Sequence, residues 1–376
     1  MTVVWLLLKA SGLLLLLALI WYLSAPVFGG KLSEADLKER YATSSQFNGK
    51  DFANAQEIDM GFSLEAIWTL MGEYFRSREI AKPPSDLPTH AITDEVLESV
   101  QPETEFIWIG HSSFLVRMDS LNILIDPMFS EVPAPANFLG GSRFTKEIPF
   151  TLDRLDRVDV VLISHDHYDH LDYPSIQALS QKTKQFLVPL GIGAHLERWG
   201  VAKEKIQELD WWEEYRFQEI QFAFTPAQHF SGRALNDRFH TLWGSWVIAG
   251  PKDRIFFSGD SGYAPHFKDI GNQYGPFDIA FMEAGQYNKR WPDVHMFPDQ
   301  SYQAGLDVRA KAMMPIHWGA FSLSTHSWKE PAVKLWSKAK NSEITVVIPE
   351  IGERVQLSNL PEVSAWWETL ETLKNP

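Results

Sequence analysis

Short runs of apolar and β-branched residues follow one another from Glu105 onward, and turn residues separate them. Such runs are typical of buried strands. The first runs are separated by the short links of hairpins, whereas later ones alternate with helical stretches such as 173–179 and 300–308. This order predicts an α/β fold in which mixed sheets pack between helices. The predicted strands are EFIWIG (105–110), SFLVRM (113–118), NILIDP (122–127), DVVLIS (159–164), QFLVP (185–189), IQFAFTP (220–226), SWVIAG (245–250), RIFFSG (254–259), DIAFME (278–283), AMMPI (312–316) and ITVVIP (344–349).

The chain on either side of this region has a different pattern. Helical periodicity covers 64–75, and prolines after it break the pattern. We interpret 31–104 as a lead-in segment that wraps the core and 105–376 as the domain that carries the sheets. Near the C-terminus, apolar residues recur at helical spacing and predict a closing amphipathic helix. These residues are Trp366, Trp367, Leu370 and Leu373.

The N-terminal segment, 1–30, is almost wholly apolar. Its uncharged stretch, 10–28, has about the 20 residues that a bilayer core requires. Trp21 and Tyr22 lie near its end, where interfacial aromatic residues are common. We therefore predict a single-pass N-terminal membrane anchor, a transmembrane helix. A cleaved signal peptide and a buried hairpin or helix are the alternatives.

The side of the membrane on which the main domain lies is less clear from sequence. Lys9 lies before the apolar stretch, and Lys31, Lys38 and Arg40 lie after it. Because positive charge flanks both ends, it barely indicates which end faces the cytoplasm. A short tail followed by an apolar run resembles an export signal. We therefore expect the domain in the periplasm, with the cytoplasmic face as the open alternative.

Composition narrows the classes of function. The net charge of −14 disfavours electrostatic binding of nucleic acid. The absence of cysteine excludes disulfides and thiolate metal sites, so any zinc ion must be held by histidines and carboxylates. The 15 tryptophans are expected in the core and around an apolar ligand groove.

The densest group of metal-binding side chains is Ser-His-Asp-His-Tyr-Asp-His at 164–170, which directly follows a strongly apolar predicted strand. In an extended backbone, residues two apart point the same way, so His165 and His167 can hold one ion. Asp169 and His170 follow and can hold a second ion. Imidazole and carboxylate groups are suitable zinc ligands. The alternative is a solvated polar loop.

Two ions need more ligands than this loop supplies. Three further residues, His229, Asp260 and His317, each follow an apolar predicted strand. A lone histidine at such a place is more often a hydrogen-bonded structural residue. Here each residue completes a coordination set that the loop has begun, and we therefore predict that all three bind metal.

The pattern HxHxDH, followed by a separate His, an Asp and a final His, resembles the metallo-β-lactamase superfamily. The match is closer to one branch, the N-acylphosphatidylethanolamine-hydrolysing phospholipase D family, and extends over 105–353. The resemblance implies an αββα sandwich of two mixed sheets flanked by helices. The blocks that resemble the branch are WIGH (108–111), LISHDHYDHLD (162–172), ELDWWE (208–213), FTPAQH (224–229), LWGSW (242–246), GDSGY (259–263), YGPFD (274–278) and IHWGAF (316–321).

The resemblance also implies two Zn²⁺ ions, each held by three side chains of its own and by one shared carboxylate. Iron and manganese accept the same ligand types and stay open. Asp169 and Asp260 are the implied catalytic residues. The implied ligands are His165, His167 and His229 for one ion, Asp169, His170 and His317 for the other, and Asp260 as the bridge.

The implied reaction is phosphodiester hydrolysis of the phospholipase D type. An N-acylphosphatidylethanolamine-like phospholipid would give an N-acylethanolamine and phosphatidic acid through attack by a metal-bridging hydroxide. The expected partners are therefore this phospholipid and the membrane, without nucleic acid. The substrate-binding residues that we predict are His295, His111, Arg290 and Trp291.

Three other functions remain open. The same metals could hydrolyse a lactone, a β-lactam or a sugar-phosphate lactone. A nuclease is disfavoured because no basic stripe with interleaved aromatic residues is present. A binding or scaffold protein with a vestigial metal site is disfavoured because all seven expected ligand positions are filled.

Overall fold

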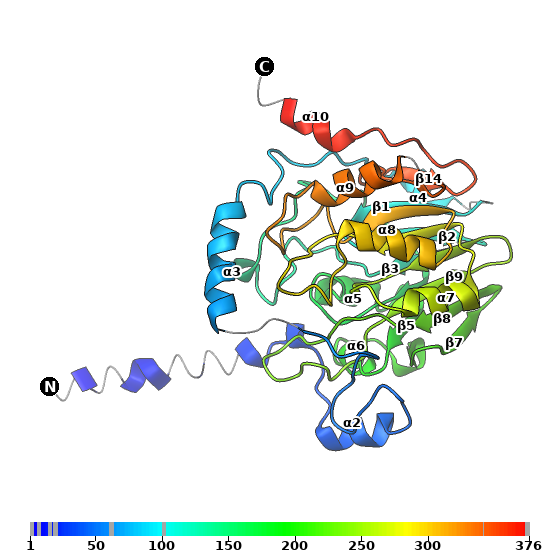
Figure 1. The fold of residues 1–376 in the computed structure, drawn as a ribbon. Coiled ribbons are helices and arrows are strands. Elements are labelled where there is room, and N and C mark those ends of the chain that lie inside the picture. The colour runs from blue at the N-terminus through cyan, green and yellow to red at the C-terminus, as the bar shows by residue number, and fades with distance from the viewer. Residues whose placement is uncertain are drawn as a thin grey trace.

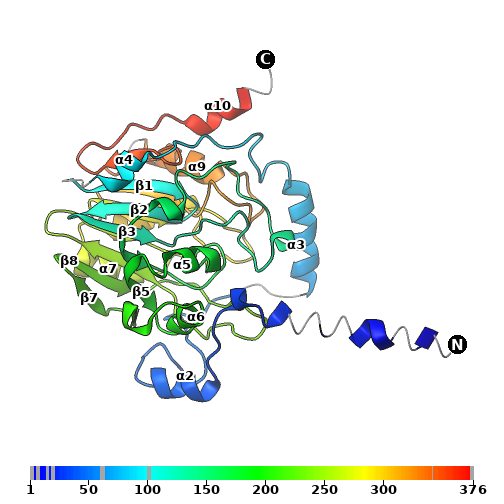
Figure 2. The same cartoon turned by 180° about the vertical axis from the view of Figure 1, so that it is seen from behind.

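Two mixed β-sheets packed face to face form the centre of the molecule, and helices cover their outer faces (Figures 1 and 2). The computed structural model describes residues 4–5, 9–13, 17, 22–59, 64–99, 103–340 and 342–372. The predicted αββα arrangement is confirmed for these residues. One sheet consists of β1 (Glu105–Gly110), β2 (Ser113–Met118), β3 (Leu121–Ile125), β4 (Val158–Leu162), β5 (Thr183–Pro189), β6 (Ile206–Leu209) and β14 (Arg354–Gln356). The other consists of β7 (Glu214–Phe217), β8 (Ile220–Thr225), β9 (Ser245–Ala249), β10 (Arg254–Phe257), β11 (Ile279–Glu283), β12 (Ala312–Ile316) and β13 (Thr345–Val346).

Each sheet is antiparallel at one side and parallel at the other. The strand orders are β14-β1-β2-β3-β4-β5-β6 and β13-β12-β11-β10-β9-β8-β7. Pairing is antiparallel from β14 to β3 and parallel from β3 to β6. In the second sheet, β7 to β10 are antiparallel and β10 to β13 are parallel. The predicted change from hairpins to βα units therefore occurs twice, once in each sheet.

Successive side chains of a strand point alternately into the layer between the two sheets and into the layer between a sheet and its helices. In β1, Phe106 and Trp108 point between the sheets, whereas Ile107 and Ile109 point to the outer layer. This is the two-residue period of a strand that is buried on both faces. Phe114 of β2 stacks on Phe281 of β11 across the interface, with ring centroids 4.2 Å apart.

The outer faces are covered by helices that lie between the parallel strands in sequence. Helices α5 and α6 cover the first sheet, and α7, α8 and α9 cover the second (Figures 1 and 2). The predicted helices at 173–179 and 300–308 correspond to α5 and α8. The helices are α2 (Glu34–Tyr41), α3 (Leu64–Ser77), α4 (Asp94–Glu98), α5 (Tyr173–Leu179), α6 (Gly193–Arg198), α7 (His266–Tyr274), α8 (Pro298–Asp307), α9 (Glu330–Ala339) and α10 (Trp366–Thr372), with short 3-10 turns η1 (Pro26–Phe28), η2 (Asn137–Leu139), η3 (Leu152–Arg154) and η4 (Lys203–Lys205).

The lead-in segment contacts the main domain at several places. The Tyr41 hydroxyl donates to Glu208 Oε2 at 2.9 Å, which ties α2 to the end of β6. The backbone N–H of Leu87 donates to the Phe144 carbonyl at 3.0 Å. These contacts agree with a segment that wraps the core.

The predicted N-terminal anchor lies largely outside the described residues. Among the residues that are described, no helix is both long enough and apolar enough to cross a bilayer.

Candidate metal centre

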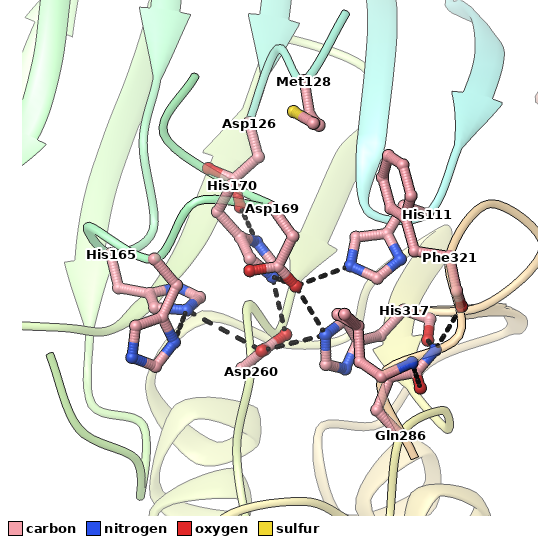
Figure 3. A network of polar contacts seen from close by, with 12 residues as sticks. His111, Asp126, Met128, His165, Asp169, His170, Asp260, Gln286, His317 and Phe321 are labelled. Atoms are coloured by element: carbon pink, nitrogen blue, oxygen red, sulfur yellow. Dashed lines mark hydrogen bonds and ion pairs between the residues drawn. The ribbon is translucent and has the colours of Figure 1, made fainter. Parts of the chain in front are cut away.

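The predicted ligands come together where several strands end at one edge of the sandwich (Figure 3). The loop after β4 carries His165, His167, Asp169 and His170, and the loops after β8, β10 and β12 carry the other three. Functional groups often lie on loops at the ends of strands, because the rigid strands fix where each loop begins. The last three residues are His229, Asp260 and His317.

The loop that carries Asp260 is shaped by the glycine before it. Gly259 has a φ of +57°, which is the left-handed region that favours glycine. A Cβ atom on Gly259 would lie 2.6 Å from the Gly244 carbonyl oxygen. The Gly-Asp pair therefore lets the chain turn sharply and bring the Asp260 carboxylate to the centre.

One group of candidate ligands consists of three imidazoles and one carboxylate. His167 Nδ1 lies 2.9 Å from His165 Nε2 and 3.2 Å from His229 Nε2. Asp260 Oδ2 lies 3.7 Å from His165 Nε2 and 3.8 Å from His229 Nε2. These four side chains could hold a metal ion.

A second group lies on the other side of the same carboxylate. Asp169 Oδ2 lies 3.2 Å from His317 Nε2 and 3.5 Å from His170 Nε2. Asp260 Oδ1 lies 3.2 Å from His170 Nε2, and Asp260 Oδ2 lies 3.2 Å from His317 Nε2. Asp260 therefore reaches both groups, one on each side.

The spacing of these atoms fits metal coordination. Four atoms bound to one zinc ion at about 2.0–2.1 Å in a tetrahedron lie roughly 3.3 Å from one another. The distances in the two groups scatter around this value. In addition, His170 Nε2 and Asp260 Oδ1 are buried without a hydrogen-bond partner in the described part of the chain. Such atoms are costly unless a ligand satisfies them, and a cation would satisfy both.

The charges of the two groups differ. Burial holds the pKa values of His165, His167 and His229 below the usual histidine value, which favours the neutral form that binds metal. Burial also acts to lower the pKa of His317, but Asp260, Asp169 and Glu283 outweigh it and raise this pKa to about 10.

The carboxylates of the centre are held in their charged form. Burial acts to raise the pKa of Asp169 and of Asp260, but His170, His317 and neighbouring histidines together outweigh it and hold both values well below the usual range. The same carboxylates act against burial to raise the pKa of His170 well above its usual value. A divalent cation bound between these groups would replace the protons on His170 and His317 as the partner of the two carboxylates.

Two buried carboxylates that were not predicted orient the imidazoles. Asp126, directly after β3, accepts from His170 Nδ1 at 2.7 Å and from the Ser164 N–H at 2.8 Å. Glu283, the last residue of β11, lies 3.0 Å from His317 Nδ1. A hydrogen bond at the second ring nitrogen fixes the tautomer and direction of a metal-binding histidine. Each carboxylate follows or ends an apolar run of the sequence, which is the signal that could have identified it.

Asp166 and Asp172, the two carboxylates of the motif region that could either hold imidazoles or cap a loop, hold loops. Asp172 accepts from the Ser175 N–H at 3.2 Å and caps α5. Asp166 accepts from the Gly232 N–H at 2.7 Å and from Thr241 Oγ1 at 2.9 Å. Both side chains therefore fix loops near the centre, and Asp126 and Glu283 are the carboxylates that contact His170 and His317.

His111, predicted to bind substrate, is buried beside the candidate ligands. Its Nε2 lies 2.8 Å from Asp169 Oδ2, its side chain is fully buried, and its φ is +56° (Figure 3). It also belongs to a group with Asp169, His170 and His317 that could hold a metal ion.

The other predicted substrate residues have protein partners. His295 Nδ1 pairs with Glu283, and these two residues form a third possible metal-holding group with Asp260 and His317. The Arg290 guanidinium lies 2.9 Å from a carboxylate oxygen of Glu73 on α3. Trp291 Nε1 donates to the Gln286 carbonyl at 3.0 Å.

Asn54 of the lead-in segment contacts a candidate ligand. Asn54 Nδ2 donates to the His229 carbonyl at 2.7 Å, and the His229 N–H donates back to Asn54 Oδ1 at 3.0 Å. This reciprocal pair fixes the backbone of a candidate ligand, and no motif around Asn54 indicated it.

Comparison with known proteins agrees with this geometry. A family described as the Beta-lactamase superfamily domain matches residues 121–318. Uncharacterized protein Rv0906 of Mycobacterium tuberculosis is 38% identical over 305 residues, which are 80% of each chain. N-acyl-phosphatidylethanolamine-hydrolyzing phospholipase D 1 of Caenorhabditis elegans is 31% identical over 308 residues, which are 77% of this chain and 86% of that protein.

The fold is also similar to solved structures. Isothiocyanate hydrolase from Delia radicum gut bacteria superposes with a TM-score of 0.55 at 19% identity, over 67% of this chain and 98% of that one. The matched family spans all seven candidate ligands. The chain therefore belongs to the metallo-β-lactamase superfamily and is a metal-dependent hydrolase with relatives among phospholipases D.

Proposed function

We propose that this chain is a two-zinc phosphodiesterase of the phospholipase D type that hydrolyses N-acylphosphatidylethanolamine-like phospholipids. The observation that carries the proposal is the pair of ligand groups that share Asp260, with neighbouring ligand atoms 2.9–3.8 Å apart. The choice of substrate rests on the similarity to the phospholipase D of C. elegans.

The proposed ligand roles follow from the two groups. When bound, two zinc ions activate water as a nucleophile and stabilise the charge on a phosphoryl group. Asp260, which lies between the two groups, would contact both ions, and Asp169 would complete the second site. His165, His167 and His229 would hold the first ion, and Asp169, His170 and His317 would hold the second.

The reaction joins a water oxygen to phosphorus and breaks the bond from phosphorus to the ethanolamine oxygen. The products are phosphatidic acid and the N-acylethanolamine, whose oxygen takes up a proton. Asp169 and His167 are the least enclosed of the ligands, so the phosphodiester approaches from their side. Phe230, with its ring 4.6 Å from that of His167, gives this approach an apolar wall.

Lipid turnover tests the proposal. The full-length, zinc-loaded protein in detergent is incubated with N-acylphosphatidylethanolamine, phosphatidylethanolamine, phosphatidylcholine and a simple lactone, and products are identified by mass spectrometry. Wild type is expected to release N-acylethanolamine and phosphatidic acid. Asp169→Asn is expected to abolish this release, whereas Asp156→Asn, at an exposed aspartate, keeps it. Opening of the lactone with intact lipids would show that the substrate class is wrong.

We also propose that segment 1–30 anchors the protein in a membrane with the hydrolase domain in the periplasm. The support is the apolar composition of this segment. Protease treatment of intact spheroplasts is expected to degrade the domain. Protection of the domain in spheroplasts and degradation only after lysis would place it in the cytoplasm.

A further inference from the structure

Helix α3 presents its apolar side to the outside of the molecule. Trp68, Met71 and Phe75 recur at the spacing of one helix face, and Trp68 and Phe75 are 72% and 73% exposed. The opposite face, with Glu73 and Ser77, turns toward the protein. Amphipathic helices of globular proteins normally bury the apolar face, so the reversed orientation indicates that something else covers it.

Other exposed apolar residues belong to loops that begin at the metal centre. The loop after Asp126 carries Phe138 and Leu139 in η2, and Phe138 is 83% exposed. The loop after His229 carries Leu235, which is 90% exposed. Single exposed apolar residues are common on protein surfaces and need no explanation. Several of them on the loops of one site indicate a surface that binds something.

Contacts tie α3 to the loops of the centre as well. The Tyr74 hydroxyl donates to the Ser322 carbonyl at 2.8 Å, and Ser322 follows the candidate ligand His317 by five residues. The ion pair from Glu73 to Arg290 joins α3 to the loop after β11. The exposed face is thus fixed relative to the metal centre.

The N-terminal segment leaves the molecule on this same side. In both views, the blue N-terminal residues project from the side on which α3 and the teal turn η2 lie (Figures 1 and 2). Arg233, two residues before Leu235, donates to the carbonyl of Val27 at 3.0 Å, where the segment joins the domain. Trp5 and Leu17 of the segment are exposed. The apolar N-terminal segment and the apolar face of α3 therefore lie on the same side of the molecule.

We infer that this face rests on a lipid bilayer and holds the loops of the metal centre at the membrane surface. The side chains that would enter the lipid are Trp68, Met71, Phe75, Phe138, Leu139 and Leu235, all of which are exposed. Tryptophan and phenylalanine are typical of surfaces that enter the interfacial layer of a bilayer. The net charge of −14 disfavours attraction of the whole molecule to anionic lipid, so we expect the contact to be mainly apolar and to persist at high salt.

This inference deepens the proposed hydrolysis of a phospholipid, and only the identity of the lipid substrate rests on that proposal. A substrate that stays in the bilayer can reach the centre without crossing water if the loops of the centre lie at the membrane surface.

Spin labelling tests the contact directly because the chain has no native cysteine. A nitroxide is attached to full-length protein through Phe75→Cys, and the protein is added to phosphatidylcholine vesicles. The matched control is Glu219→Cys at the exposed turn between β7 and β8. We expect the label at position 75 to be accessible to oxygen and protected from a water-soluble nickel chelate, and the label at 219 to show the reverse, also at high salt.

Two outcomes would overturn the inference. Equal access of the nickel chelate to both labels on vesicle-bound protein would mean that only the N-terminal segment holds the membrane. Spin–spin broadening at position 75 without oxygen access would mean that a second copy of the chain covers the face. Neither readout requires turnover, so failure of the proposed reaction leaves this test intact.

The rate of lipid turnover on vesicles provides a second test of the contact with the bilayer. The double variant Trp68→Ser, Phe75→Ser is expected to turn over vesicle-bound lipid at least about tenfold more slowly than wild type, since two large apolar side chains no longer enter the bilayer. Its zinc content and its turnover of a short-chain monomeric substrate are expected to stay unchanged. Equal rates on vesicles would contradict the inference.

Discussion

At the scale of single residues, the centre depends as much on the groups that hold the ligands as on the ligands themselves. Four candidate ligands, His165, His170, His229 and His317, have their second ring nitrogen within hydrogen-bond distance of a protein acceptor. Such contacts set the tautomer and the direction of each ring. The ligand positions were predictable from sequence because they stand in one dense motif and at three strand ends. Asp126 and Glu283, which hold two of the rings, were not predicted: each stands at the end of an apolar run, but a single carboxylate there does not show which histidine it contacts.

Asp126 provides a test of this dependence. Asp126→Asn removes the charged acceptor of His170 Nδ1 without changing the size of the side chain. We expect roughly 10–100-fold weaker zinc binding, as is usual when such a partner is lost. Titration of the apoprotein against a competing chelator measures this, with Asp156→Asn as the control. Unchanged affinity would show that His170 is held adequately without Asp126.

Two substitutions of His111 distinguish between positioning of Asp169 and direct binding of metal. If it positions Asp169 through the 2.8 Å contact, His111→Gln keeps a donor near the carboxylate, and His111→Ala does not. We expect two zinc ions per chain in both variants, with affinity near wild type for Gln and about tenfold or more weaker for Ala. Loss of one ion from both variants would instead identify His111 as a ligand.

At the scale of elements, strands were predicted best where both faces are buried. The runs at 105–110 and 113–118 correspond to β1 and β2, because continuous burial leaves a continuous apolar sequence. The strand β7 was missed because two of its four side chains are exposed and charged. Helix α3 was predicted, but not the direction of its apolar face, since the helical period does not show which side faces the protein.

The C-terminal helix α10 supports the loop of a candidate ligand. Trp366 stacks on Trp318, the residue after His317, with ring centroids 5.8 Å apart, and Trp367 is fully buried beside them. We expect Trp367→Ala to lower the free energy of unfolding by about 3–5 kcal/mol in urea denaturation, because it leaves a cavity. The matched variant Trp68→Ala, at an exposed tryptophan, should change it by less than about 0.5 kcal/mol. Similar effects of the two variants would contradict the packing of α10.

At the scale of the whole molecule, the centre joins the two sheets. The loop after β4 comes from one sheet, and the loops with His229, Asp260 and His317 come from the other. An ion that binds only the folded protein stabilises it according to its concentration and affinity. Zinc at a thousand times its dissociation constant is therefore expected to add about 4 kcal/mol to the free energy of unfolding.

Thermal denaturation with and without a chelator measures this effect, and a lower midpoint without zinc is expected. The control is Asp260→Asn, which removes the shared carboxylate and should reduce the difference between the two conditions. A wild-type midpoint that does not depend on zinc would mean that the loops do not share a metal site.

The measurement that tests the central claim most directly is hydrolysis of N-acylphosphatidylethanolamine in water enriched in ¹⁸O. Attack of water on phosphorus predicts one ¹⁸O atom in the phosphate of the phosphatidic acid and none in the N-acylethanolamine. Label in a released fatty acid would show attack on a carbonyl instead. That result, or an intact lipid, would contradict the proposed phosphodiesterase.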